Sequence, residues 1–203
     1  IFSLPAMFGL LVLAEHIIST LFQYGSFKIT DTLMSSLSLL AYAIGLPAFI
    51  LMKVLLTGFF SRQDTLTPVK YGAIAVVFNI SMNVCVVLYY LSNPFQGAHA
   101  LLALATSLSA WLQVILLYIR LTKDRIINKN CFLNRDFFKS LFSCIIMSFL
   151  LIIVLPDLNK WISYEYFQRG FYILAYVISG ALIYFLLMKI FKTNFRQMVY
   201  GNN

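Results

Sequence analysis

Charged residues are scarce in this sequence. They make up 11% of the 203 residues, whereas water-soluble domains carry roughly a quarter. Hydrophobic residues make up 61%, and the mean hydropathy is +0.87. Such a chain has too few polar groups to cover a water-exposed surface, which excludes an ordinary soluble domain.

Negative charge is the scarcer sign, with 7 Asp and Glu against 15 Lys and Arg and a net charge of +8. A positive excess can indicate nucleic-acid binding, but here the positive residues lie between apolar runs and form no basic face. They are better interpreted as determinants of membrane topology. We therefore predict no nucleic-acid partner.

Catalytic and metal-binding motifs are also lacking. The sequence has no HExxH, no GxSxG and no phosphate-binding Gly-rich loop, and His16 and His99 lie far apart. Its three cysteines form no CxxC pair. Cys85 and Cys144 lie in apolar runs and are expected to be buried. We predict that the protein is not an enzyme and has no metal site.

Long apolar runs are what the sequence does contain. Six of them approach the roughly 20 residues that cross a bilayer. They are Ile1–Phe22, Leu33–Phe60, Val69–Leu91, Ala98–Ile119, Phe137–Leu155 and Gly170–Phe191. The prediction is an all-α integral membrane protein with six transmembrane helices, the second kinked near Gly45 and Pro47. Because the chain begins within an apolar run, we expect a piece of a longer protein.

The distribution of Lys and Arg among the loops predicts the orientation. One side carries eleven: Arg62, Lys70, Arg120, Lys123, Arg125, Lys129, Arg135, Lys139, Lys189, Lys192 and Arg196. The other side carries three: Lys28, Lys160 and Arg169. The richer side should be cytoplasmic, which places both ends of the chain in the cytoplasm.

A polar turn between the second and third runs carries the most specific pattern. It belongs to a set of five segments: Leu4–Glu15, Leu21–Phe27, Gly45–Leu46, Lys53–Leu55 and Gly58–Lys70. Together these segments resemble the MurJ/MviN family, the flippases for the lipid-linked peptidoglycan precursor lipid II. The resemblance implies the last six helices of a fourteen-helix transporter of the bacterial cytoplasmic membrane. It also implies alternating access, lipid II and membrane lipids as partners, and a first lobe outside this chain.

The same resemblance implies an inner gate at the polar turn. Its candidate residues are Lys53, Arg62, Gln63, Asp64 and Lys70. A solvated connector is the alternative for the turn. Lys53 either extends to the membrane interface or faces a cavity that holds a pyrophosphate.

Polar side chains recur within the third and fourth runs. Asn79 and Asn83 share one helix face, as do Thr106, Ser109 and Gln113. They either form hydrogen bonds between helices or bind an ion. Some members of the family bind sodium at this place and have a carboxylate about where Asn83 stands. The resemblance therefore implies a possible sodium site at Asn79, Asn83 and Thr106, while the amide of Asn83 lacks that negative charge and counts against sodium coupling. No other cofactor is expected.

Three regions are predicted. Residues 1–120 would form four helices of the second transport lobe, 121–136 a basic cytoplasmic loop, and 137–203 two helices. The family resemblance implies that these two, rich in aromatics such as Phe142, Phe149, Tyr172 and Phe185, form a groove for the lipid tail.

Three other functions stay open at this stage. The chain can belong to an exporter of another lipid-linked oligosaccharide or of a drug. It can be a membrane enzyme acting on polyprenyl phosphate, although Asp64, Asp124 and Asp136 are scattered as metal ligands. It can also be a scaffold that no longer transports.

Overall fold

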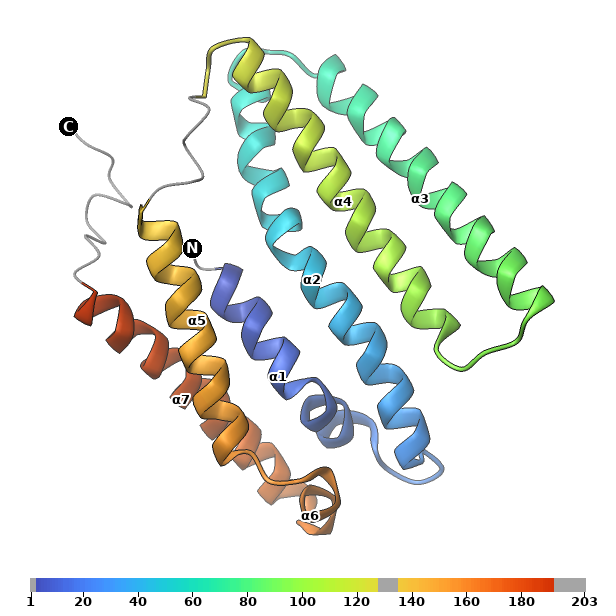
Figure 1. The fold of residues 1–203 in the computed structure, drawn as a ribbon, viewed down its shortest axis with the longest axis vertical. Coiled ribbons are helices and arrows are strands. Elements are labelled where there is room, and N and C mark those ends of the chain that lie inside the picture. Colours follow the sequence, from blue (N-terminus) through green and yellow to red (C-terminus); the bar gives the residue numbers. More distant parts are fainter. Residues whose placement is uncertain (1–2, 128–134, 192–203) are drawn as a thin grey trace. The chain divides into compact units, whose positions relative to one another are not determined.

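The fold is all-helical in a computed structural model, which describes residues 3–127 and 135–191 (Figure 1). These residues form α1 (Ser3–Phe22), α2 (Ile29–Phe60), α3 (Leu66–Ser92), α4 (Ala98–Lys123), α5 (Arg135–Val154), α6 (Leu158–Ser163) and α7 (Tyr166–Ile190). All except α6 are long and apolar enough to cross a membrane. The prediction of six transmembrane helices is confirmed.

Two helices begin about one turn before the predicted apolar run. α2 begins at Ile29, where the Asp31 carboxylate accepts a hydrogen bond from the Lys28 N–H at 2.9 Å. α7 begins at Tyr166, where the Gln168 side chain accepts one from the Glu165 N–H at 3.3 Å. Hydropathy locates the apolar part of a helix, whereas capping of the first N–H groups decides where it begins.

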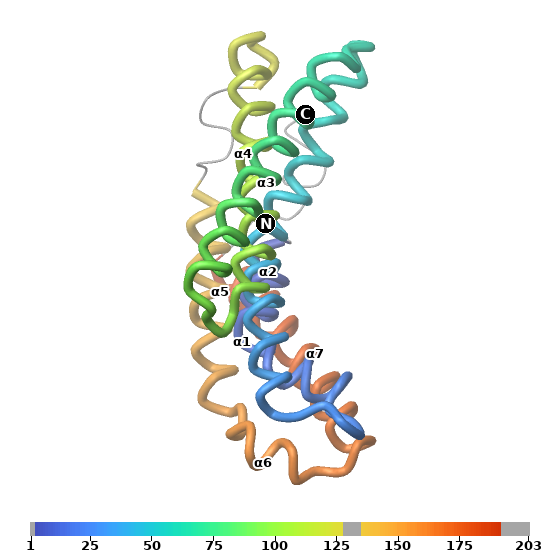
Figure 2. The backbone as a smooth tube through the Cα atoms, turned by 90° about the vertical axis from the view of Figure 1, so that its right-hand side faces the viewer, coloured from blue at the N-terminus to red at the C-terminus, as the bar shows by residue number. Residues whose placement is uncertain are grey.

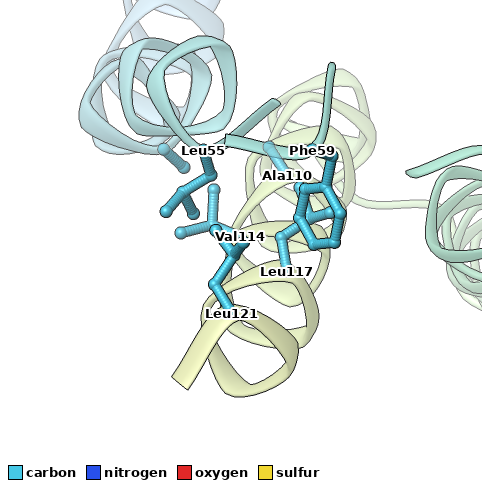
Figure 3. Close-up of a cluster of buried hydrophobic side chains, with 7 residues drawn as sticks. Leu55, Phe59, Ala110, Val114, Leu117 and Leu121 are labelled. Atoms are coloured by element: carbon cyan, nitrogen blue, oxygen red, sulfur yellow. The ribbon is translucent and has the colours of Figure 1, made fainter. Parts of the chain in front are cut away.

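The described helices fall into two compact units, divided after Val12 and after Cys131. In the unit of residues 13–131, α4 packs against both α2 and α3. The α2–α4 contact is a buried apolar cluster in which side chains of the two helices point toward each other (Figure 3). Its members are Ala48, Leu55, Phe59, Ala110, Val114, Leu117 and Leu121. This cluster packs the end of α2, which carries the polar turn, against the end of α4.

The middle of α2 is pinned to α4 by side-chain hydrogen bonds. Pro47 has no N–H, so the α2 backbone loses one bond there. Ser107 Oγ donates to the Ala41 carbonyl at 2.7 Å, and Trp111 Nε1 donates to the Ile44 carbonyl at 3.0 Å. Neighbouring helices commonly stabilise proline-containing membrane helices in this way.

The exposed face of α3 corrects one expectation. Cys85 is exposed and not buried, because α3 packs mainly against α4 and presents most of its surface outward. Only Pro68 and Ala75 of α3 are buried. Its large apolar residues, such as Val77 and Leu88, are therefore available to lipid or to other parts of a longer protein.

The second unit comprises residues 1–12 and 132–203. Its α5 and α7 pack through a buried cluster that includes Cys144, Met147 and Met188, so the expected burial of Cys144 is confirmed. The short α6, which was expected to be a loop, connects α5 to α7 (Figure 2). Arg169 of α7 is 5% exposed and fixes this connection: its Nε donates to the Tyr164 carbonyl at 2.9 Å, and its Nη2 donates to the Ile162 carbonyl.

Candidate functional site

The polar turn between α2 and α3 is a folded cap. The Gln63 N–H donates to the Phe60 carbonyl at 3.0 Å, and the Asp64 N–H donates to the Phe59 carbonyl at 3.1 Å. Gln63 itself has a left-handed backbone, with φ of 58°. This is the Schellman arrangement that commonly ends a helix, here with a glutamine where glycine is usual. The turn thus has a defined conformation.

Asp64 links the turn to α3. Its Oδ1 accepts a hydrogen bond from the Thr67 N–H at 3.0 Å. Hydrogen bonds from the side chain and backbone of Thr67 lower the pKa of Asp64, and the positive charge of Arg120 contributes in the same direction. Asp64 is therefore ionised at neutral pH, where its negative charge stabilises the start of α3.

Arg62 contacts a different carboxylate. Its Nη1 lies 3.4 Å from Oδ2 of Asp124, which follows the last residue of α4. Nε of Arg120 lies 3.5 Å from the same oxygen. Asp124 thus joins the ends of α2 and α4, directly beyond the buried cluster of Figure 3. The Arg62 side chain is 52% exposed, so other donors of its guanidinium remain open to a further partner.

The end of α4 repeats the form of the α2 end. The Arg125 N–H donates to the Thr122 carbonyl at 3.1 Å, the Ile126 N–H donates to the Leu121 carbonyl at 3.0 Å, and Arg125 has φ of 57°. Arg62 and Asp124 therefore occupy equivalent positions, each just before a left-handed residue. Sequence reasoning considered Asp124 only as a metal ligand and missed it as the partner of Arg62. The signal was available, since alternating spans place the ends of α2 and α4 on the same side.

The other gate candidates lie apart from this ion pair. Lys53 is exposed on α2, two turns before its end, and Lys70 is exposed at the start of α3. Neither belongs to an ion pair within the described part of the chain. Gln63 contributes its backbone to the cap. The structure brings Arg62 together with Asp124 and Arg120, and not with Lys53 or Lys70.

The three residues of the possible sodium site do come together, between α3 and α4. Asn83 Nδ2 donates to Asn79 Oδ1 at 3.1 Å, and Asn79 Nδ2 donates to Thr106 Oγ1 at 3.4 Å. Oδ1 of Asn83 is buried and accepts no hydrogen bond from the described residues. Three neutral oxygens are thus present, but the described chain places no carboxylate among them. The set therefore offers a cation oxygen ligands but no negative charge.

These features define a class of protein: a multi-pass, all-helical membrane protein with a structured polar turn at one end of its helices. The family model described as lipid II flippase MurJ matches residues 1–177. The chain belongs to this family, whose description is that of a transporter.

Relatives and a solved structure agree with that assignment. The chain is 35% identical over 180 residues to the probable lipid II flippase MurJ of Haemophilus influenzae, covering 89% of this chain and 34% of that protein. It is 49% identical over 115 residues to the one of Vibrio cholerae, covering 57% and 21%. A structure of lipid II flippase MurJ in an inward closed conformation matches with a TM-score of 0.72 and 26% identity, covering 98% of this chain and 37% of that one. The chain spans about a third of the length of these proteins.

Proposed function

We propose that this chain is the C-terminal part of a transporter that moves lipid II across the bacterial cytoplasmic membrane by alternating access. The observation that carries the proposal is the family match over residues 1–177. Because the chain spans about a third of its relatives, the remaining helices would supply the other transport lobe. Rocking of one helical bundle against another around a central site is the common scheme for such folds.

Complementation tests the function. The intact transporter that contains this chain is expected to restore growth to bacteria depleted of their lipid II flippase. A related exporter of another substrate would restore none. Normal membrane levels of the protein without restored growth would therefore contradict the proposal.

The orientation belongs to the same proposal. Eleven Lys and Arg residues on one side against three on the other favour cytoplasmic ends and a cytoplasmic α2–α3 turn. Cysteines introduced at Ser26, Gln96 and Ser163 are expected to react with an impermeant thiol reagent in intact cells, in a background without native cysteines. Cysteines at Gln63, Asn128 and Asn202 should stay unlabelled. The opposite pattern would invert the topology and remove the turn from the inner side.

We propose that Asp124 holds Arg62 at the inner mouth of the transport path. The buried apolar cluster between α2 and α4 makes separation of the two helix ends costly. The Arg62–Asp124 ion pair would therefore persist while the lobes move. The open donors of Arg62 would then contact a phosphate of lipid II or a carboxylate of the other lobe in one state and release it in the other. Lys53 and Lys70 would add positive charge nearby.

The proposed roles of the regions follow the family. Residues 1–120 would belong to the second transport lobe, with 121–136 as the cytoplasmic connection; part of that connection lies outside the described residues. Residues 137–203, of which 192–203 also lie outside them, would provide the tail groove. Large exposed apolar side chains on α5 and α7 support this role, including Phe142, Phe149, Phe171, Leu174 and Phe185.

We propose that the Asn79–Asn83–Thr106 group serves mainly as a contact between α3 and α4 and binds sodium weakly. Asn83→Asp in the intact transporter should create sodium dependence, because a carboxylate adds a full negative charge to two neutral oxygens. Transport measured in sodium and in potassium should differ for Asn83→Asp and stay equal for the wild type. Strong sodium dependence of the wild type that Asn83→Leu abolishes would show that the native amides suffice.

A further inference from the structure

A pocket of about 660 Å³ lies at the opposite end of the helices from the polar turn. It forms where the start of α2, the end of α3 and the start of α4 meet, three segments that lie at the same end of their unit (Figure 1). The side chains that matter for its chemistry are Thr30 and Met34 from α2, Tyr90 from α3, and Phe95, Gln96 and His99 from the α3–α4 turn and α4.

Contacts among these segments give the pocket its form. The Phe95 ring lies 5.8 Å from the Tyr89 ring and 6.0 Å from the Tyr90 ring, between centroids, so the turn is folded back onto α3. Nε2 of His99 lies 2.8 Å from the Met34 carbonyl oxygen and joins the start of α4 to α2. These contacts hold Phe95, Tyr90 and His99 in place before any ligand arrives.

The lining contains aromatic rings, an amide, hydroxyl groups and the imidazole of His99, whose Nε2 contacts the Met34 carbonyl oxygen, but no Asp, Glu, Lys or Arg. A phosphate or a divalent cation would find no opposite charge there. A purely apolar ligand would make no use of the hydrogen-bonding groups of Gln96 and Thr30, which are exposed on this lining. A sugar ring fits both requirements, because its C–H face stacks on Tyr90 or Phe95 while its hydroxyls bond to side-chain amide and hydroxyl groups.

We propose that this pocket binds an uncharged saccharide at the outer face of the membrane. The assignment of its natural ligand as the sugar part of lipid II rests on the proposed function and orientation. In that setting the pocket would hold the sugar after it has crossed, away from the basic residues at the inner end. The polar turn and the pocket would thus contact chemically different parts of one substrate.

Chitobiose, an uncharged disaccharide of N-acetylglucosamine, is the probe. Saturation-transfer difference NMR on the intact transporter in nanodiscs should show transfer to chitobiose. Phe95→Ala removes a stacking surface and Gln96→Leu removes hydrogen bonds while keeping the size of the side chain, so each should reduce binding about fivefold or more. Phe167→Ala is the matched control, because Phe167 is a 93% exposed aromatic residue on α7 outside this pocket.

Two results would overturn the assignment of this pocket as a saccharide site: no saturation transfer to chitobiose in the wild type, or undiminished transfer in Gln96→Leu. Equal loss in Phe167→Ala would do so as well, because it would show nonspecific contact with exposed rings. Complementation of flippase-depleted bacteria is measured in parallel. Chitobiose binding without complementation would support the saccharide site and refute the flippase function. Complementation without chitobiose binding would support the flippase function and refute the saccharide site.

Discussion

Arg62→Ala in the intact transporter is expected to abolish complementation of a flippase-depleted strain without lowering the amount of protein in the membrane. The alanine removes the contact with Asp124 and every donor that the exposed guanidinium offers at the inner mouth. Arg62→Lys should recover only part of the activity, because an ammonium cannot reproduce a bidentate contact with a carboxylate or phosphate. Growth and membrane protein levels are the two measurements.

Lys123→Ala is the matched control. Lys123 is exposed at the end of α4, beside Asp124, and belongs to no ion pair of the described residues. Arg125 is less suitable, since its left-handed backbone gives it a part in the cap. Lys70→Ala should be milder than Arg62→Ala, because a point charge near the headgroups is easier to replace. Equal tolerance of Arg62→Ala and Lys123→Ala would mean that the turn is only a solvated connector.

Asp124→Asn tests whether the carboxylate positions Arg62. The asparagine keeps the size of the side chain but weakens both arginine contacts. Activity should fall between the wild type and Arg62→Ala. Combining Asp124→Asn with the partly active Arg62→Lys should cost less activity than the two single losses added together, as expected for residues that act together. Fully additive losses would contradict a shared role.

Gly45→Ala is expected to destabilise the contact between α2 and α4 by about 2 kcal/mol. A Cβ at this position would lie 2.5 Å from Ser107 Oγ and 2.9 Å from Ser107 Cβ. Ser107 cannot move away freely, because its hydroxyl donates to the Ala41 carbonyl. The thermal unfolding midpoint of the purified intact transporter should fall clearly below that of the wild type.

Gly9→Ala provides the comparison, since a Cβ on Gly9 of α1 meets no atom within 4 Å. In a helix interior that change should be neutral or slightly stabilising. Ser107→Gly should partly rescue Gly45→Ala by removing the atoms that clash. Equal thermal unfolding midpoints for Gly45→Ala and Gly9→Ala would contradict the close approach of α2 and α4 at Gly45.

Several features could be predicted before the structure. The six spans follow from apolar runs. The spacing of Asn79 and Asn83 predicted a shared helix face, and the hydrogen bond between their side chains confirms it. The pattern around the polar turn pointed to the family that the family model then matched. Each of these inferences depends on residues that are near one another in the sequence.

Other features could not be found in this way. Asp124 lies 62 residues from Arg62 and appeared as one of several scattered acids. The short α6 contains too few residues for a recognisable period, and the buried Arg169 that fixes it was counted only as a loop charge. The pocket at the other end combines residues from three helices.

The sequence alone therefore determined the membrane class, the number of spans and the expected orientation. The bilayer acts on each segment separately, through its own hydropathy and flanking charge, so a local pattern is sufficient. The tertiary structure decided which side chains meet. That outcome depends on the rotation and register of each helix against its neighbour, and these are set by the close approach of Gly45 to Ser107 and by the buried cluster between α2 and α4.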